Sequence, residues 1–224
     1  MALRPSPTVE DYLQLIHHMT SEGKPVIGSH VAEKMGVAVA TSFATVQRMQ
    51  RDGLVEVNDH KEILLTGTGK EAAEAVIRRH ALAERLLVDL LHLPWHEAHE
   101  EAHNFEHAIS PRVEKQLMLL LNSPTTCPHG NPIPGQGAKL PADTIRLANA
   151  TDGYRGVIVR VQEDAENEPH LLEYLQVHGL VPGGEVVVSG IQPWNGLMVV
   201  RHQDEDIPLG LAAAQKIWVR LAAD

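Results

Sequence analysis

Histidine and glutamate side chains gather in one part of this sequence, where together they could bind a divalent cation. Six of the fourteen histidines lie between His80 and His107. On a helix that turns about 100° per residue, His99, His103, Glu106 and His107 fall within an arc of roughly 100°. Such a narrow stripe normally faces a core, where polar groups are costly to bury unless a partner satisfies them. A cation that accepts imidazole and carboxylate ligands, such as Mn, Fe, Co, Ni or Zn, would be that partner.

A second pair of ligand-type side chains precedes this stripe. His80 and Glu84 are four residues apart, so they share one face of a helix. A helical hairpin could bring that face opposite His99. The alternative is a polar, solvated helix surface with no ion. The spacing favours two metal sites: His80, Glu84 and His99 in one, and His103, Glu106 and His107 in the other.

Residues 103–107, HNFEH, also match the H-x-x-E-H pattern of inverted zincin proteases. In that interpretation His103 and His107 bind zinc, and Glu106 is the general base. The motif is short, and the chain lacks the length of those proteases. We therefore predict a metal-binding protein that is not an enzyme.

Residues 26–66 have the order of helix, turn, helix and wing. A helix over residues 40–51 has Phe43, Val46 and Met49 on its expected inner stripe, and Gly53 ends it. Alternating residues on both sides of the turn at 58–61 predict a two-stranded wing. This arrangement places one helix in the major groove and a hairpin beside the phosphates.

The polar side of this second helix offers short hydroxyl groups and arginines that suit bases and phosphates. The preceding segment, residues 37–40, is unusually apolar, which suggests contacts to thymine methyls or reliance on DNA shape. A winged helix that binds another protein is the alternative. The expected DNA contacts are Thr41, Ser42, Thr45, Arg48, Arg51, His60 and Lys61.

Composition limits the other classes of function. The 224 residues are 43% hydrophobic and carry a formal net charge of −10, which argues against non-specific attraction to nucleic acid or membrane. No apolar run is long enough for a transmembrane helix, and the first residues do not resemble a signal peptide. A single cysteine, Cys127, excludes an internal disulfide framework and favours a reducing cytoplasm. We interpret Cys127 as a structural residue.

Three domains are expected from the change in periodicity along the chain. Helical patterns over residues 76–91, 95–109 and 112–121 give way to a loop rich in Pro and Gly. Short β-branched strands with glycine turns then predict a small β-barrel. The expected domains are a winged helix-turn-helix over 1–75, a helical dimerisation and metal domain with its Pro-rich linker over 76–140, and a β-domain over 145–224.

Several segments together resemble the diphtheria toxin repressor family of iron- and manganese-dependent transcriptional repressors. They are VEDYLQLIHHM, VAEKMGV, VQRMQRDGLVEV, LLTGTGKEAAEAVIRRHALAERLLVDLL, HEEAHNFEHAISPRVEKQL and CPHGNPIPG, and they span most of the chain. The resemblance implies a mainly α protein with a small β part: a winged helix-turn-helix, a helical dimerisation and metal domain, and a C-terminal SH3-like, FeoA-type barrel.

The resemblance also implies ligands that spacing does not supply. Asp11 matches the family position that completes a primary site with His103, Glu106 and His107. The ancillary site of His80, Glu84 and His99 would receive polar side chains from the SH3-like domain, for which Glu168 and His170 lie near the matching region. Iron-type members carry Met and Cys where this chain has Asp11 and His103. A site without sulfur favours Mn(II) or Fe(II) over soft ions, and of the two we favour manganese.

The resemblance thus implies a regulator that takes up about two Mn(II) or Fe(II) ions per subunit. The metal-loaded homodimer would bind a pseudo-palindromic double-stranded operator and control metal-homeostasis genes in the cytoplasm, without a membrane partner. The alternative is a metal-binding buffer protein that has lost DNA binding. Phe43 and Ala44 stand where relatives often carry Ser and Gln, so the resemblance does not give the operator sequence.

Overall fold

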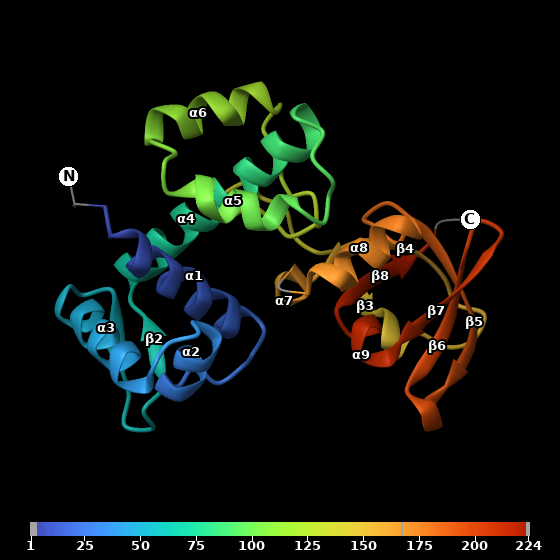
Figure 1. Ribbon diagram of the computed structural model, residues 1–224, viewed down its shortest axis with the longest axis horizontal. Helices are drawn as coiled ribbons and strands as arrows, with labels where there is room; N and C mark the ends of the chain where they lie inside the picture. The colour runs from blue at the N-terminus through green and yellow to red at the C-terminus, as the bar shows by residue number, and fades with distance from the viewer. Residues whose placement is uncertain (1–3, 167, 223–224) are drawn as a thin grey trace. The chain divides into compact units, whose positions relative to one another are not determined.

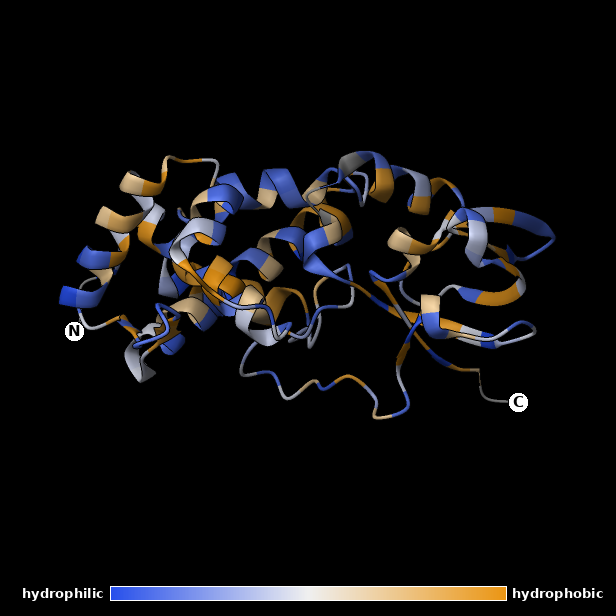
Figure 2. Cartoon of the chain, turned by 90° about the horizontal axis from the view of Figure 1, so that it is seen from below, coloured by the Kyte–Doolittle hydropathy of each residue, from blue (hydrophilic) through white to orange (hydrophobic). Residues whose placement is uncertain are grey.

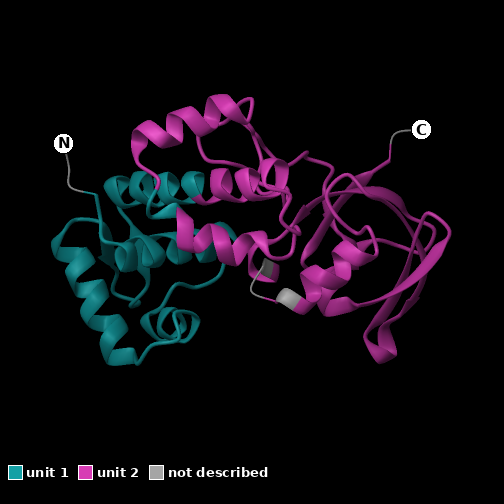
Figure 3. Cartoon of the chain, turned by 45° about the horizontal axis from the view of Figure 1, so that its top comes forward, with its two compact units in different colours: residues 1–79, 106–108 teal, residues 80–105, 109–224 magenta. Residues whose placement is uncertain are grey.

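The computed structural model describes residues 4–166 and 168–222 (Figure 1). The chain divides into two compact units, drawn in different colours in Figure 3. The first unit comprises residues 1–79 and 106–108, and the second comprises residues 80–105 and 109–224.

The first unit is the winged helix that the sequence predicts. Hydrophilic and hydrophobic residues alternate along the helices of the chain in Figure 2, as in helices with one buried and one exposed face. Gly36, with φ of +64°, makes the turn between the second and third helices. The wing strands pair antiparallel, with Val55 opposite Leu65. The elements are α1 (Pro7–Ser21), α2 (Gly28–Lys34), α3 (Val39–Arg51), β1 (Val55–Val57), β2 (Ile63–Leu65) and α4 (Gly67–Arg85), the last of which continues into the second unit.

The core of this unit forms beneath α1 and α3. Tyr12, Leu13 and Ile16 of α1 are almost completely buried, as is Met49 of α3. The expectation that Phe43 lies on the inner stripe is wrong, because its side chain is 60% exposed. The buried stripe of α3 instead consists of Ser42, Val46 and Met49.

The helical part of the second unit begins in α4, which passes into a π-helical turn, η1 (Leu86–Leu90). The helix expected over residues 95–109 is shorter in the structure, where α5 spans Ala98–Glu106. Trp95 precedes it in a turn, with a buried indole that donates to the carbonyl oxygen of Pro128 at 3.1 Å. The next helix, α6 (Pro111–Leu120), begins one residue before the expected start, because the Ser110 hydroxyl caps it by accepting from the Val113 amide.

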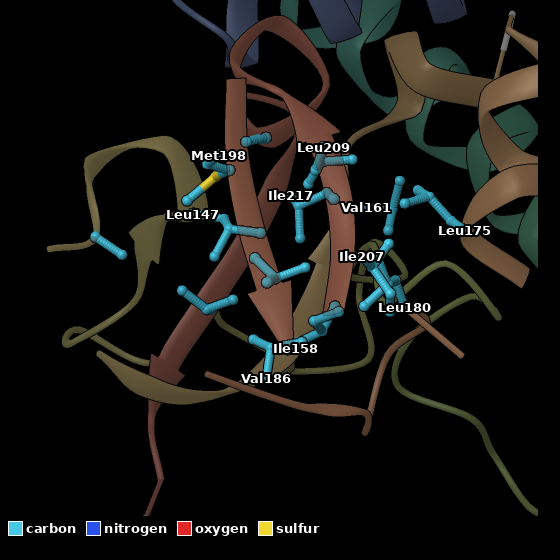
Figure 4. Close-up of a cluster of buried hydrophobic side chains, with 14 of the residues drawn as sticks. Leu147, Ile158, Val161, Leu175, Leu180, Val186, Met198, Ile207, Leu209 and Ile217 are labelled. Carbon is cyan, nitrogen blue, oxygen red and sulfur yellow. The ribbon is translucent and has the colours of Figure 1, made fainter. Parts of the chain in front are cut away.

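A six-stranded antiparallel sheet forms most of the remainder, in the order β3-β8-β4-β5-β6-β7. Residues that alternate along these strands pack into one core with the residues of α8 (Figure 4). Strands β3 and β7 were not predicted. Pro208 lies in β7, which is an edge strand, where a missing backbone donor is tolerated. The bounds are β3 (Ile145–Arg146), β4 (Arg155–Val161), β5 (Glu185–Gln192), β6 (Leu197–His202), β7 (Glu205–Gly210) and β8 (Ile217–Leu221), with η2 (Leu147–Asn149), α7 (Glu163–Glu166), α8 (Pro169–Val177), η3 (Pro193–Asn195) and α9 (Leu211–Ala214).

The Pro-rich loop between α6 and β3 is held against β4. The Val161 amide donates to the carbonyl oxygen of His129 at 2.8 Å, and the Asn131 amide side chain donates to the carbonyl oxygen of Val161 at 3.1 Å. Gly130 has φ of +83°, and a Cβ there would overlap the carbonyl of Val159. The loop therefore has one fixed path past the strand. No helix among the described residues is long and apolar enough to cross a membrane.

Candidate metal centres and DNA-reading helix

The first candidate metal centre lies within the winged-helix unit and joins α1 to the end of α5. Asp11, Glu106 and His107 each offer a ligand atom, and these atoms all lie within 4.8 Å of one another. The His107 Nε2 atom is 3.0 Å from Asp11 Oδ1 and 3.5 Å from Glu106 Oε1. Ligands at roughly 2.1 Å from a first-row cation stand up to roughly 4.2 Å apart. The spacing and the donor types therefore fit such a cation.

Glu10 orients the imidazole of this centre. Its Oε2 is 2.8 Å from His107 Nδ1, while Oε1 accepts from Arg79 and from Arg4, each at 2.7 Å. Burial alone would raise the pKa of Glu10, but hydrogen bonds from Arg4 and His107 and the charge of Arg79 outweigh it and lower that pKa. The ionised Glu10 holds the Nδ1 proton, so that Nε2 faces Asp11.

His103, the fourth predicted ligand, belongs to the second unit. Its side chain is exposed on α5, and its ring centroid lies 6.5 Å from that of His80. The structure thus gathers Asp11, Glu106 and His107 in one unit. The participation of His103 stays a prediction.

The second candidate centre is the predicted ancillary group. The Glu84 Oε1 atom is 3.1 Å from His80 Nε2 and 3.4 Å from His99 Nδ1, and the two nitrogen atoms are 3.1 Å apart. Glu84 is 1% exposed and His80 is 6% exposed. Two imidazoles and one carboxylate therefore converge, as the helical spacing predicts, with His99 on the partly exposed side of the group.

A third group shares Glu84, and the sequence interpretation missed it. Cys127 Sγ lies 3.9 Å from His129 Nδ1, which in turn is 3.4 Å from Glu84 Oε1. All three side chains are buried. Burial tends to raise the pKa of Glu84, but the charges and hydrogen bonds of His129 and His80 lower it well below its usual value. The sequence does contain a signal, the pair of ligand-type residues Cys127 and His129 in CPHG. Because this pair lies in a loop, no helical spacing relates it to Glu84.

Glu168 and His170 are not part of these groups in the structure, and their expected ancillary role stays a prediction. The Glu168 carboxylate accepts from Lys216, and the fully exposed His170 ring lies 4.0 Å from Glu173. Among residues 4–166 and 168–222, no cluster of metal-ligating atoms includes either of the two. A chain segment that aligns near the family position does not bring these side chains to Glu84.

Most of the expected DNA contacts are exposed in the winged helix, but Ser42 is an exception. Its side chain lies on the buried face of α3 and is completely inaccessible, so its expected role as a DNA contact is wrong and it belongs to the core. Thr45 is half-buried, and its hydroxyl donates to the carbonyl oxygen of Thr41 at 3.2 Å. In the wing, the Asn58 side chain accepts from the His60 amide at 3.0 Å and so shapes the turn. The side chains that remain accessible are Thr41, Arg48, Arg51, His60 and Lys61.

Comparisons with known proteins find a matching family model for each of the three parts of the chain. Residues 6–63 match the family model "Iron dependent repressor, N-terminal DNA binding domain". Residues 66–135 match "Iron dependent repressor, metal binding and dimerisation domain", and residues 145–221 match the FeoA domain. The iron-dependent repressor IdeR of Mycobacterium tuberculosis is 38% identical over 222 residues, which is 94% of this chain and 96% of that protein.

The chain belongs to the diphtheria toxin repressor family. The diphtheria toxin repressor of Corynebacterium diphtheriae is 36% identical over 171 residues, 76% of this chain and 72% of its own length. Among solved structures, a manganese-dependent transcriptional repressor in complex with manganese has a TM-score of 0.83 at 31% identity, with 96% of this chain and 100% of that chain covered. The manganese regulator SloR has a TM-score of 0.78 at 29% identity, with 97% and 100% covered.

Membership of the diphtheria toxin repressor family excludes the enzyme among the alternatives that the sequence left open. The family consists of metal-dependent transcriptional regulators rather than enzymes, so the zinc hydrolase interpretation of residues 103–107 is excluded. The mainly α architecture with a C-terminal FeoA-type sheet is confirmed.

Proposed function

We propose that this chain is a metal-activated repressor in which a cation joins α1 of the winged helix to the end of α5. The observation that carries the proposal is the convergence of Asp11, Glu106 and His107, with His107 Nε2 3.0 Å from Asp11 Oδ1. Two carboxylates and one imidazole at one point suit a divalent ion. We place the protein in the cytoplasm, where its DNA would be.

The link from metal to DNA runs through the packing of α1. Asp11 precedes Tyr12 and Leu13, two residues that are almost completely buried in the core that also holds Met49 of α3. When bound, the cation would supply positive charge that offsets the repulsion between the Asp11 and Glu106 carboxylates. Asp11 would then hold α1 in the position seen here, and α1 would hold α3. Metal therefore selects the conformer that presents α3 to DNA.

The metal of this primary site is Mn(II) or Fe(II) in our proposal, with manganese favoured. The donors of Asp11, Glu106 and His107 are oxygen and nitrogen only, and these ligands suit harder first-row ions. His103 is the fourth ligand that we predict on α5. A second ion per subunit would bind at Glu84, which gives about two ions per subunit.

Two arrangements compete for the second ion, since Glu84 can join either His80 and His99 or Cys127 and His129. We favour the imidazole pair for manganese, because thiolate selects softer ions. Titration with Co(II) distinguishes the two, because only a thiolate ligand gives an intense near-ultraviolet charge-transfer band. We expect no such band from the wild type. We expect the band from His80→Ala, in which Co(II) can bind only with Cys127 and His129. An intense band in the wild type that Cys127→Ser removes would assign the ancillary site to Cys127.

The DNA partner in this proposal is a pseudo-palindromic operator bound by a homodimer, which controls metal-homeostasis genes. A two-fold dimer presents two copies of α3, and each copy would read one half-site. We keep the domain limits of 1–75, 76–140 and 145–224 as part of the proposal.

Fluorescence anisotropy with metal-loaded and chelator-treated protein tests the function. The duplex is one that the Mn(II)-loaded wild type selects from a random-sequence library. We expect tight binding with Mn(II), weak binding with chelator, and weak binding by Asp11→Ala in Mn(II). The matched control is Asp152→Ala, an exposed aspartate of the C-terminal domain, which should bind as the wild type does. Equal binding by wild-type protein with chelator and with Mn(II) would refute the proposal.

A further inference from the structure

The first half of the reading helix presents an apolar surface to solvent. Val39 and Phe43 are each 60% exposed, and Val37, just before the helix, is 36% exposed. The small side chains of Ala40 and Ala44 are exposed beside them. Apolar side chains that are exposed next to one another, rather than singly, are typical of a surface where a partner binds.

Helix geometry places these side chains on one continuous arc beside the buried stripe. At about 100° per residue, Val39, Ala40, Phe43 and Ala44 span roughly 140° of the helix. The buried stripe of the helix covers the adjoining arc, and Val46 lies at the edge of it that is nearer to Val39. The exposed apolar arc is therefore a surface in its own right and does not complete the core of the domain.

The chemistry around the arc favours DNA over a protein as its occupant. Helix α3 contains no Asp or Glu, and its next turns carry Arg48 and Arg51, both exposed. A stable protein interface buries roughly 800 Å² on each side, whereas this arc is two large side chains within one helical turn. An arc of this size can contact only a few base edges, and the two arginines that follow it are placed to contact phosphates.

The arc also limits how the helix can read bases. In this half of the helix only Thr41 and Thr45 carry side-chain hydrogen-bonding groups on or near the surface, and the Thr45 hydroxyl already donates to the Thr41 carbonyl oxygen. Hydrogen-bond readout by this half is therefore weak. The one apolar feature of base edges in the major groove is the C5-methyl group of thymine, which alanine and phenylalanine side chains contact.

We propose that Phe43, with Val39 beside it, is the specificity-determining contact of this protein and packs against thymine methyl groups in each half-site. The inference rests on the proposed function, since it needs α3 to enter the major groove. It assigns an operator class in which thymines occupy the positions that face the N-terminal half of α3. Because a thymine methyl group forms no hydrogen bonds, a polar side chain at position 43 would not replace this contact.

Removal of single methyl groups from the DNA tests this role. The probe is the duplex that Mn(II)-loaded wild-type protein selects from a random library, resynthesised with deoxyuridine in place of each thymidine in turn. This exchange removes the C5-methyl group and leaves the pairing unchanged. We expect a loss of roughly fourfold in affinity at each contacted thymine, the factor that corresponds to burial of one methyl-sized group.

Phe43→Ala completes a double-mutant cycle between this side chain and the thymine methyl groups. The variant should bind the thymine duplex more weakly than the wild type, and deoxyuridine at the same positions should cause no further loss, because the contact is already absent. Trp194→Ala, which truncates an aromatic side chain that is 81% exposed in the C-terminal domain, is the control and should retain every deoxyuridine effect. Circular dichroism confirms that Phe43→Ala is folded, as an exposed position should allow.

The outcomes separate the two claims. Metal-dependent binding with no deoxyuridine effect at any thymine would overturn the role of Phe43 and leave the proposed function standing. Equal deoxyuridine effects in the wild type and Phe43→Ala would also overturn it. If Mn(II)-loaded protein selects no duplex from the library, the proposed function fails and this inference fails with it.

Discussion

Glu10 should control metal affinity although it is not a ligand in this account. Its Oε2 atom is 2.8 Å from His107 Nδ1, and the other nitrogen of the same ring is 3.0 Å from Asp11. Glu10→Ala removes the acceptor that fixes the imidazole, so the ring can rotate or take the wrong tautomer. We expect the variant to retain the fold and to bind Mn(II) more weakly.

Two independent magnitudes give the size of this loss. Removal of an outer-shell partner of a metal-bound histidine typically costs about 10- to 100-fold in affinity. A hydrogen bond to a charged group contributes about 1.5–3 kcal/mol, which is about 10- to 150-fold. Glu10→Gln keeps an oxygen that can accept from Nδ1, so its loss should be less than about tenfold. The electron paramagnetic resonance signal of free Mn(II) in a titration measures both.

A structural effect must be separated from this positioning effect. Glu10→Ala leaves Arg79, which is 4% exposed, without its carboxylate, and an unpaired buried charge is destabilising. The double variant Glu10→Ala with Arg79→Met removes that charge and should recover stability but not metal affinity. Glu33→Ala, an exposed glutamate of α2, is the matched control. Mn(II) affinity within twofold of the wild type in a folded Glu10→Ala variant would refute the reasoning.

Three further predictions concern stability. The pKa of Glu10 is lowered by folding, so the ionised carboxylate stabilises the metal-free fold above about pH 4.5. This stability is lost as the pH falls through the folded-state pKa, and the difference in Tm between wild type and Glu10→Gln should therefore shrink in acid. A difference in Tm that grows in acid would contradict this. Ser110→Ala removes the cap of α6 and should cost about 1 kcal/mol in chemical denaturation, with Ser123→Ala as a control outside the helix. Gly130→Ala should lower Tm by more than about 2 °C, because the added Cβ meets the Val159 carbonyl and φ is positive, and an unchanged Tm would show that the loop can move.

Much of the helical part followed from the sequence because its signals are local. The helical pattern over residues 112–121 placed α6 to within one residue, and the i, i+4 spacing placed His80 and Glu84 on one face. Val46 and Met49 of α3 are buried as predicted, but Phe43 was wrongly assigned to the core because it is apolar. Where an apolar residue is kept for a partner, burial cannot be inferred from hydropathy.

The parts that the sequence could not give depend on long-range contacts. The approach of His129 to Glu84 joins residues 45 positions apart through a loop without periodicity, so no helical spacing announces it. Likewise, the partners of Glu168 and His170 are set by local packing in the C-terminal domain, which a family position does not specify. Asp11 came from the resemblance alone, and its approach to His107 depends on the packing of α1.

The most direct test of the central claim is anomalous diffraction at the manganese absorption edge from a crystal grown with Mn(II). The account predicts an anomalous peak within bonding distance of Asp11, Glu106 and His107 together. A manganese peak elsewhere, with Asp11 and His107 separated and no ion between them, would contradict it.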